Sequence, residues 1–194
     1  MAIEIEAKLS VPSHDAVRAR LKELSAQRVG AVLETNTFFD TDDRSLLAAD
    51  KGLRLRQARE GATSKENPKS TLTYKGPRRH GQLKSREEIE LGINGDRQLI
   101  DLLSALGFGR VLTFEKRRES WKLGGCSVEL DELPHLGNFV EIEGPDDATI
   151  LKVREQLQLD QRPLVKASYV ALLMTHLQER GQTTRVVMFD SSTK

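Results

Sequence analysis

Charged and apolar side chains alternate along the first residues of the chain. Glu4, Glu6 and Lys8 share one parity, while the positions between them are Ile3, Ile5, Ala7 and Leu9. Successive side chains of a β-strand point to opposite faces, so this period of two is typical of a strand with one apolar face. The pattern predicts a strand over residues 2–9 whose other face carries two carboxylates and an ammonium group.

The same alternation returns in later parts of the chain. Charges two residues apart recur in the segments Leu53–Arg56, Arg86–Glu90 and Val140–Glu143. Asp40–Asp43 and Gly124-Gly125 are typical of turns. The chain is therefore predicted to form eight strands, at residues 2–9, 30–39, 53–60, 70–76, 83–91, 109–122, 126–132 and 137–143.

Apolar residues at helical spacing predict four helices between and after these strands. The first follows Ser13 as N-cap, the second runs from Asn94 to Gly107, the third follows Asp146-Asp147, and the fourth covers residues 166–177. The pattern ends near residue 180. One domain over residues 1–179 and a flexible tail over residues 180–194 are expected.

Eight strands with few helices between them favour antiparallel pairing and an α+β fold. The charged face carries too many charges to pack dry against a second sheet. Either an open sheet turns that face to water, or the strands close into an eight-stranded antiparallel β-barrel with a hydrated polar interior, which also removes the sheet edges. In the closed arrangement, helices pack on the outer apolar face.

Composition narrows the function classes. The chain has 194 residues, with 38% hydrophobic and 30% charged residues, and a net charge of +1. This near-neutral balance argues against general binding to nucleic acid or to an acidic membrane. The single cysteine excludes an intrachain disulfide, and neither a signal peptide nor an apolar run of about 18 residues is visible. A cytoplasmic protein is expected.

Both signs of charge gather on the predicted polar face. Its acidic residues are Glu4, Glu6, Glu88, Glu90, Glu129, Asp131, Glu141 and Glu143, and its basic residues are Lys8, Arg54, Arg56, Lys75, Arg86, Lys116 and Arg118. Any one pair fits ordinary solvated surface, because exposed ion pairs contribute little. Six charged runs on six strands indicate a shared site instead. Arginine and lysine suit phosphate oxygens, and carboxylates suit Mg²⁺, so a triphosphate with its metal would use both sets.

Several motifs resemble those of the CYTH superfamily, which contains class IV adenylyl cyclases and thiamine-triphosphatase-like enzymes. Glu4-Ile5-Glu6-Ala7-Lys8 resembles its ExExK signature. Further segments follow in the family's order: Phe38–Thr41, Leu53–Arg56, Leu72–Pro77, Arg86–Glu90, Glu115–Arg118, Leu130-Asp131, Leu136–Glu143 and Lys166–Tyr169. The resemblance covers about residues 2–177.

The resemblance implies a triphosphate tunnel, a barrel of eight antiparallel strands that is open at both ends. It implies Mg²⁺ or Mn²⁺ as cofactor, held by Glu4, Glu6, Glu141 and Glu143, with Glu129 and Asp131 as further candidates and Glu88 and Glu90 as other tunnel acids. Glu4, Glu6 and Lys8 are the expected catalytic residues. The expected phosphate ligands are Lys8, Arg54, Arg56, Lys75, Arg86, Lys116, Arg118 and, from the last helix, Lys166.

Two reactions fit this resemblance. In a cyclase, the ribose 3′-hydroxyl of ATP attacks the α-phosphate and pyrophosphate leaves; in a triphosphatase, water attacks the terminal phosphate of tripolyphosphate or thiamine triphosphate. The run of motifs is most similar to the class IV cyclase branch. A non-catalytic polyphosphate or nucleotide binder is the alternative of another class, although Glu4 and Glu6 argue against it. The expected partner is a small triphosphate rather than nucleic acid or membrane, and a homodimer is common in the family.

Overall fold

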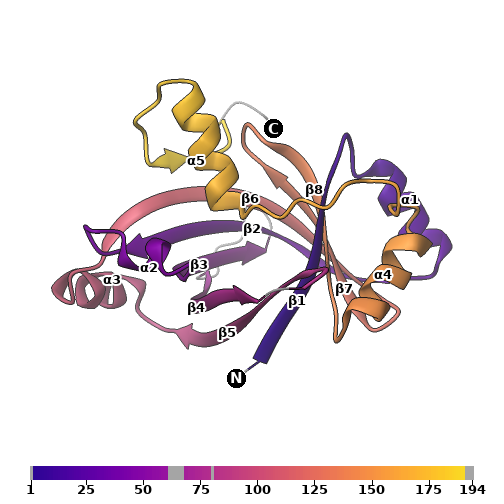
Figure 1. Cartoon of the computed structure of the whole chain (residues 1–194), viewed down its shortest axis with the longest axis horizontal. Coiled ribbons are helices and arrows are strands. Elements are labelled where there is room, and N and C mark those ends of the chain that lie inside the picture. Colours follow the sequence, from indigo (N-terminus) through magenta and orange to yellow (C-terminus); the bar gives the residue numbers. More distant parts are fainter. Residues whose placement is uncertain (1, 61–67, 80, 191–194) are drawn as a thin grey trace.

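A computed structural model describes residues 2–60, 68–79 and 81–190 of the protein (Figure 1). Its elements in chain order are β1 (Ala2–Val11), α1 (Asp15–Glu23), β2 (Gln27–Asp40), α2 (Ser45–Ala48), β3 (Gly52–Glu60), β4 (Lys69–Arg79), β5 (Lys84–Ile93), α3 (Asp96–Ala105), β6 (Gly109–Leu123), β7 (Cys126–Leu133), β8 (Gly137–Glu143), α4 (Asp147–Gln156), α5 (Tyr169–Glu179) and β9 (Val186–Val187). None of these helices is long and apolar enough to cross a membrane.

Eight strands close into a barrel. Their order around it is β2-β3-β4-β5-β1-β8-β7-β6, and a further β2–β6 ladder joins the two ends of the sheet. Every neighbouring pair in this ring is antiparallel. The closed α+β barrel predicted from the alternation is confirmed, and the open sheet is excluded.

The ninth strand lies outside this ring. β7 pairs with β6 only from Arg117 onward, and β9 pairs in parallel with Thr113 and Phe114 on the part of β6 that β7 leaves. Val187 of β9 is buried, and the backbone N–H of Phe189 donates to Glu115 Oε2 at 3.0 Å. A flexible tail was expected here, whereas residues 186–189 contact β6. The sequence did not predict this strand, because two residues are too few to show alternation. Residues 191–194 of the expected tail lie outside the described residues.

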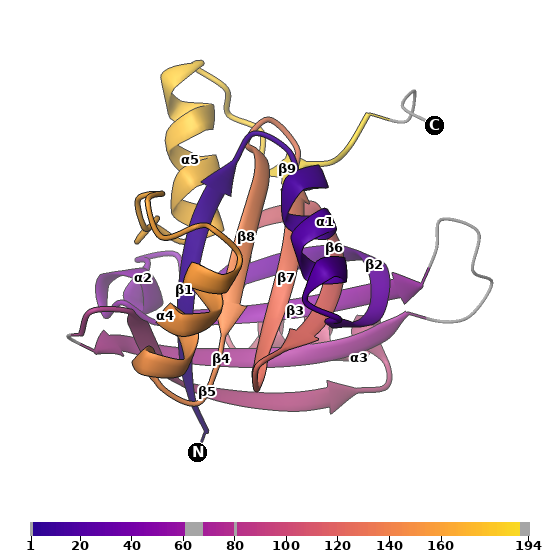
Figure 2. The ribbon, with the colours of Figure 1, turned by 90° about the vertical axis from the view of Figure 1, so that its right-hand side faces the viewer.

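Three helices cover the outer face of the barrel. α1 and α4 lie side by side against β1, β7 and β8 (Figure 2), where Val17, Leu21, Ile150 and Val153 pack with outward-facing residues such as Leu9 and Val140. Leu103 of α3 packs against Phe39 and Leu55. Burial of these side chains contributes roughly 1.5–3 kcal/mol each, so the apolar face predicted from parity is the main stabilising surface.

The fourth long helix, α5, lies over one end of the barrel (Figure 1). Tyr169 and Leu173 pack with Leu112, Phe114 and Phe139. These strand residues have the inward parity of the charged residues, so α5 covers interior rather than outer surface. α1, α3 and α4 pack on the outer face as predicted, and α5 adds a cover over inward-facing residues at one end.

Local differences concern the ends of elements. α1 begins after His14, and the Ser13 hydroxyl accepts from the backbone N–H of Asp15 rather than capping the helix from the N-cap position. Asp146 is the N-cap of α4, as predicted, and accepts from the N–H of Thr149. α5 begins three residues later than predicted, after Ser168, whose hydroxyl accepts from the N–H of Ala171.

Candidate functional site

The interior of the barrel contains a cavity of about 430 Å³. Seven barrel strands contribute to its wall, together with residues around α2 and the beginning of α5. Its basic lining residues are Lys8, Lys51, Arg54, Arg56, Lys75, Arg78, Lys84, Arg86, Lys116 and Arg118, and its acidic ones are Glu4, Glu6, Asp50, Glu88, Glu90, Glu141 and Glu143. Cations therefore outnumber carboxylates, which favours an anionic ligand.

Most residues predicted from sequence meet in this cavity. Of the expected phosphate ligands, all except Lys166 line it. Of the expected acids, all except Glu129 and Asp131 line it. The common parity of the strand residues is the reason, because barrel closure turns one face of every strand inward.

The predicted metal carboxylates come from the adjacent strands β1 and β8. Glu6 lies opposite Glu143 in the ladder, and Lys8 lies opposite Glu141. Lys75 Nζ lies 2.8 Å from Glu4 Oε2, and Lys84 Nζ contacts Glu6 Oε1. Each of these two carboxylates is therefore paired with a lysine of another strand, Glu4 with Lys75 of β4 and Glu6 with Lys84 of β5.

Glu141 is held by two cations. Its Oε1 lies 3.3 Å from Lys8 Nζ, and its Oε2 accepts from Arg118 Nη2 at 2.6 Å. Burial would raise the pKa of Glu141, but Lys8 and Arg118 hold that pKa well below its usual range. Burial lowers the pKa of Lys8, and the Glu141 and Glu6 carboxylates oppose this only in part.

The pKa values of Glu4 and Glu143 are shifted in opposite directions. Burial would raise the pKa of Glu4, but Lys75 brings that pKa below its ordinary value. Glu143 lies at the exposed rim; partial burial and the negative charges of Glu4, Glu88 and Glu6 raise its pKa to about 7. Negative charge is thus in excess around Glu143, where a bound cation would lower the repulsion.

This donor set fits a hard divalent cation. Oxygen ligands are those that Mg²⁺ takes, and it usually needs only one or two carboxylates besides water and phosphate. Within the described ranges, however, no three such side chains form a ready-made metal site. Instead, the ammonium groups of Lys75 and Lys84 lie beside Glu4 and Glu6 and neutralise these carboxylates.

Two arginines carry unpartnered donors inside the barrel. The Nε atoms of Arg54 and Arg86 are buried and have no hydrogen-bond partner. The remaining contacts of Arg54 are long: Nη2 lies 3.3 Å from Thr73 Oγ1 and 3.9 Å from Glu88 Oε1. A buried donor without an acceptor is costly, so these guanidinium groups are suited to an anion entering the cavity.

Asp131 and Glu129 occupy other positions than a metal site requires. Asp131 is fully buried and accepts from Arg118, from Lys116 at 3.3 Å and from the Tyr169 hydroxyl at 3.0 Å. Glu129 accepts from the Ser120 hydroxyl. This geometry does not support either residue as a metal ligand. Asp131 is fully buried and does not line the cavity, and it instead holds Lys116 and Arg118 of β6 in place.

The sequence interpretation missed Glu34, Asn36 and Lys84. Glu34 is buried on β2, 3.2 Å from Lys116 Nζ, and Asn36 Nδ2 donates to it at 3.4 Å. Burial would raise the pKa of Glu34, but Lys116, Arg118 and Arg56 hold that pKa well below its usual range. Parity could have found Lys84, which lies two residues before Arg86. Lys166 is exposed and lines a smaller adjoining cavity.

The sequence matches the model of the CYTH domain over residues 2–169. The chain belongs to the CYTH family. One relative, "Putative adenylate cyclase MJ0240" of Methanocaldococcus jannaschii, is 26% identical, with 88% of this chain and 98% of the relative covered. Adenylate cyclase CyaB of Aeromonas hydrophila is 30% identical, with 80% and 76% covered.

A solved structure shares the CYTH fold. HpAC1 from Hippeastrum, described as an adenylyl cyclase candidate with a dominant triphosphatase activity, superposes with a TM-score of 0.65 at 22% identity. The superposition covers 93% of this chain and 97% of HpAC1. At this identity the likeness shows the fold alone. The barrel is therefore the CYTH fold, and the motifs that resembled the superfamily are confirmed as those of a member.

Proposed function

We propose that this CYTH protein is a metal-dependent enzyme that binds ATP with its triphosphate in the barrel and converts it to cyclic AMP and pyrophosphate. One observation carries the proposal: seven predicted phosphate ligands and the carboxylates Glu4, Glu6, Glu141 and Glu143 line one cavity. The relative CyaB, which bears the name of an adenylate cyclase and is 30% identical, supports the choice of reaction.

The basic residues bind and orient the phosphates. Arg54 and Arg86 offer buried donors that have no acceptor, and Lys116 and Arg118 are held in place by Asp131. Fixed cations need little reorganisation as negative charge moves from the α-phosphate to the leaving pyrophosphate, which is how electrostatic catalysis lowers a barrier. Lys116 and Arg86 are buried, and water screens the charges of buried groups less than those of exposed ones, which strengthens their attraction for an anion.

The carboxylates of β1 and β8 would hold the metal. Glu4, Glu6, Glu141 and Glu143 are the donors for Mg²⁺ or Mn²⁺, which when bound neutralises phosphate charge and favours ionisation of an attacking hydroxyl. Lys75 and Lys84 pair with Glu4 and Glu6 and also line the cavity. Their ammonium groups would therefore lie within reach of both the metal carboxylates and the phosphate oxygens.

Hydrolysis is the second candidate. Glu90 and Glu143 lie exposed while lining the cavity, so solvent reaches the phosphate site. Water attack on a terminal phosphate needs neither a base pocket nor an aligned ribose hydroxyl. The activity described for HpAC1 belongs to a protein of the same fold, and it makes tripolyphosphate a necessary test substrate.

Product analysis separates these functions. The protein is incubated with Mg²⁺ or Mn²⁺ and either ATP or tripolyphosphate, and the products are identified by chromatography. Cyclic AMP with equimolar pyrophosphate is expected. Orthophosphate from both substrates without cyclic AMP would establish the triphosphatase instead, and tight binding of both without any product would establish a binding protein.

A further inference from the structure

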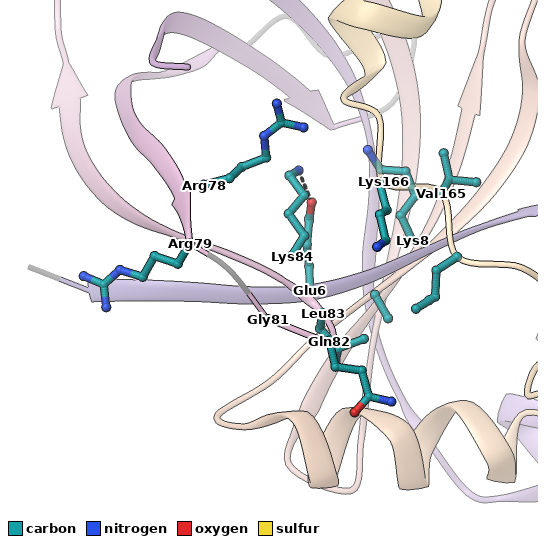
Figure 3. A pocket seen from close by; sticks show the side chains of 12 residues that line it. Glu6, Lys8, Arg78, Arg79, Gly81, Gln82, Leu83, Lys84, Val165 and Lys166 are labelled. Atoms are coloured by element: carbon teal, nitrogen blue, oxygen red, sulfur yellow. Dashed lines mark hydrogen bonds and ion pairs between the residues drawn. The ribbon is translucent and has the colours of Figure 1, made fainter. Parts of the chain in front are cut away.

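A second, smaller cavity of about 190 Å³ adjoins the barrel cavity (Figure 3). Four residues line both: Glu6, Lys8, Arg78 and Lys84. The two spaces therefore meet at these side chains. Figure 3 shows the Glu6–Lys84 ion pair there, with Arg78 and Arg79 on one side and Val165 and Lys166 on the other. We call this smaller cavity the side chamber.

The wall of the side chamber differs from that of the tunnel. The uncharged side chains of its wall are the apolar Ala7, Leu83, Leu164 and Val165, and the side-chain amide of Gln82 adds a neutral polar group. Charged groups of the chamber are mostly those shared with the tunnel. The chamber is thus a mainly apolar recess beside a strongly cationic space, which is the usual composition of a site for the organic part of a charged ligand.

Main-chain contacts fix the part of the chamber wall that Leu164 and Val165 form. Leu164 forms a bridge with Leu9 of β1, and the N–H of Val165 donates to the carbonyl of Lys8 at 2.7 Å. Leu83 is almost completely buried. These contacts fix the apolar wall relative to Lys8, so the recess is formed before any ligand arrives.

We propose that the side chamber binds the heterocyclic base of a nucleoside triphosphate whose phosphates lie in the barrel. This inference rests on the proposed function and gives the place where the base of that substrate binds. Glu6 and Lys8 line both spaces, so a ligand that passes them lies partly in each. The apolar wall would cover one face of the ring, and Gln82 would contact its polar edge.

The charges at the junction select among the triphosphates. Arg78, Arg79, Lys84 and Lys166 surround the recess, together with Lys8. Cations attract the face of a neutral aromatic ring and repel a positively charged one. A neutral nucleobase is therefore favoured over the cationic thiazolium of thiamine triphosphate.

The recess is also poorly suited to an inorganic phosphate. Its volume corresponds to roughly six water molecules, and a phosphate placed against Leu83, Leu164 and Val165 would face side chains without donors. Inorganic tripolyphosphate would use the barrel cations and leave the side chamber unfilled. Binding of ATP and of tripolyphosphate should thus respond differently to a change in the chamber wall.

The test compares two ligands on one set of variants. Leu164→Trp fills the recess, and Gln82→Ala removes the neutral polar group from an exposed position. Calorimetric dissociation constants for ATP and tripolyphosphate are measured in EDTA, so that metal-dependent turnover does not consume the ligands. Leu106→Trp and Gln161→Ala are the matched controls, because both residues are exposed and lie outside either cavity.

We expect Leu164→Trp to weaken ATP binding by at least about tenfold and Gln82→Ala by about threefold, corresponding to one lost contact. Both variants should keep the tripolyphosphate constant within about twofold, which also shows that the barrel is folded. Equal loss for both ligands, or no loss for ATP, would overturn the inference. Wild-type protein that binds ATP no better than tripolyphosphate and thiamine triphosphate would do the same.

The result can be separated from a failure of the proposed function. Turnover of triphosphates by the wild-type protein with Mg²⁺ is measured independently. If no triphosphate is converted but the ATP-specific loss is found, the chamber is a base site of a binding protein. If triphosphates are converted and the two ligands respond alike, the reaction stands and the side chamber has no part in recognising the base.

Discussion

The two ends of the barrel interior share strands but differ in chemistry. On the inward face of β6, Leu112 and Phe114 lie under α5, and the next two inward residues, Lys116 and Arg118, line the charged cavity. The alternation of the strand is the same in both parts. What differs is the partner: a helix covers one part, while the other faces the cavity and the charged side chains of other strands. A period of two therefore indicates which residues point inward, but it does not indicate which of them are buried in an apolar cluster and which line a cavity.

Tyr169 lies at the boundary between these regions. Its ring packs edge-on against Phe139, with 5.2 Å between centroids, and lies 3.9 Å below Lys8 Nζ. Its hydroxyl donates to Asp131. One side chain of α5 thus belongs to the apolar end and also supports the buried charges of the tunnel.

The largest effect is expected from removing a charge at the polar end. Glu6→Gln should lower kcat by about 10²–10³-fold or more, because the side chain keeps its shape but loses the charge that would attract a divalent metal. Unfolding temperature should change little. Glu87→Gln is the matched control, since Glu87 neighbours Glu88 on β5 but does not line the cavity. Full activity in Glu6→Gln would contradict the metal assignment; Glu4→Gln is expected to behave in the same way.

At the apolar end, the expected loss is in stability. Leu173→Ala deletes a fully buried side chain of α5 and should lower the free energy of unfolding by about 2–5 kcal/mol, measured by urea denaturation. Leu102→Ala on α3 is the control, because Leu102 is 56% exposed and should cost little. A smaller loss for Leu173 than for Leu102 would show that α5 does not close the barrel.

A smaller effect is expected from a single phosphate ligand. Arg54→Ala should raise the half-saturation concentration for the triphosphate about 10- to 100-fold, as expected for a lost charge-assisted hydrogen bond of roughly 1.5–3 kcal/mol. Arg59→Ala, on the same strand but exposed and outside the cavity, should leave it unchanged. Steady-state kinetics decide the point, and identical constants for Arg54→Ala and wild type would remove Arg54 from the site.

The smallest effect concerns Glu143 and pH. Its pKa of about 7 in the folded protein exceeds the ordinary value of 4.5, so the folded state binds this proton more tightly. Stability from this group is present at low pH and is lost as pH rises through about 7. Glu4 and Glu141, whose pKa values are lowered, remain ionised throughout pH 5–8.

Melting temperatures in EDTA at pH 5 and pH 8 test this expectation. The wild-type protein should lose more stability between these values than Glu143→Gln, and the difference between the two proteins removes the common contribution of the histidines. Parallel pH profiles would show that the Glu143 carboxyl titrates normally. Added Mg²⁺ should reduce the wild-type loss at pH 8.

Much of the barrel could be predicted from the sequence because each strand exposes two chemically different faces. β8 has the predicted bounds, 137–143, and no end of β3, β5 or β7 differs from its predicted position by more than two residues. The four-residue helix α2 could not be predicted, since it has no apolar period. It depends instead on the buried Asp40 carboxylate, which accepts from the N–H groups of Leu46 and Leu47.

Site residues could be predicted where the alternation of the strand alone places them in the cavity. They were misassigned or missed where tertiary packing determines their surroundings. Arg54 and Arg56 followed directly from their spacing. Asp131 has the same inward parity, yet α5 places Tyr169 over it, and that contact depends on tertiary packing that no local pattern reveals. Glu34 was overlooked because its neighbours of the same parity, Asn36 and Phe38, are uncharged, so no pair of charges two residues apart marks this part of the strand.

The short pairing between β9 and β6 has a consequence for truncation. The N–H of Thr113 donates to the carbonyl of Arg185 at 2.8 Å, in the stretch of β6 that β7 has left. Cutting the chain after Glu179 would leave these main-chain groups open beside the newly uncovered Phe114. An exposed strand edge with unpaired N–H and C=O groups can pair with another molecule. The shortened protein should therefore self-associate, although every residue of the tunnel is intact.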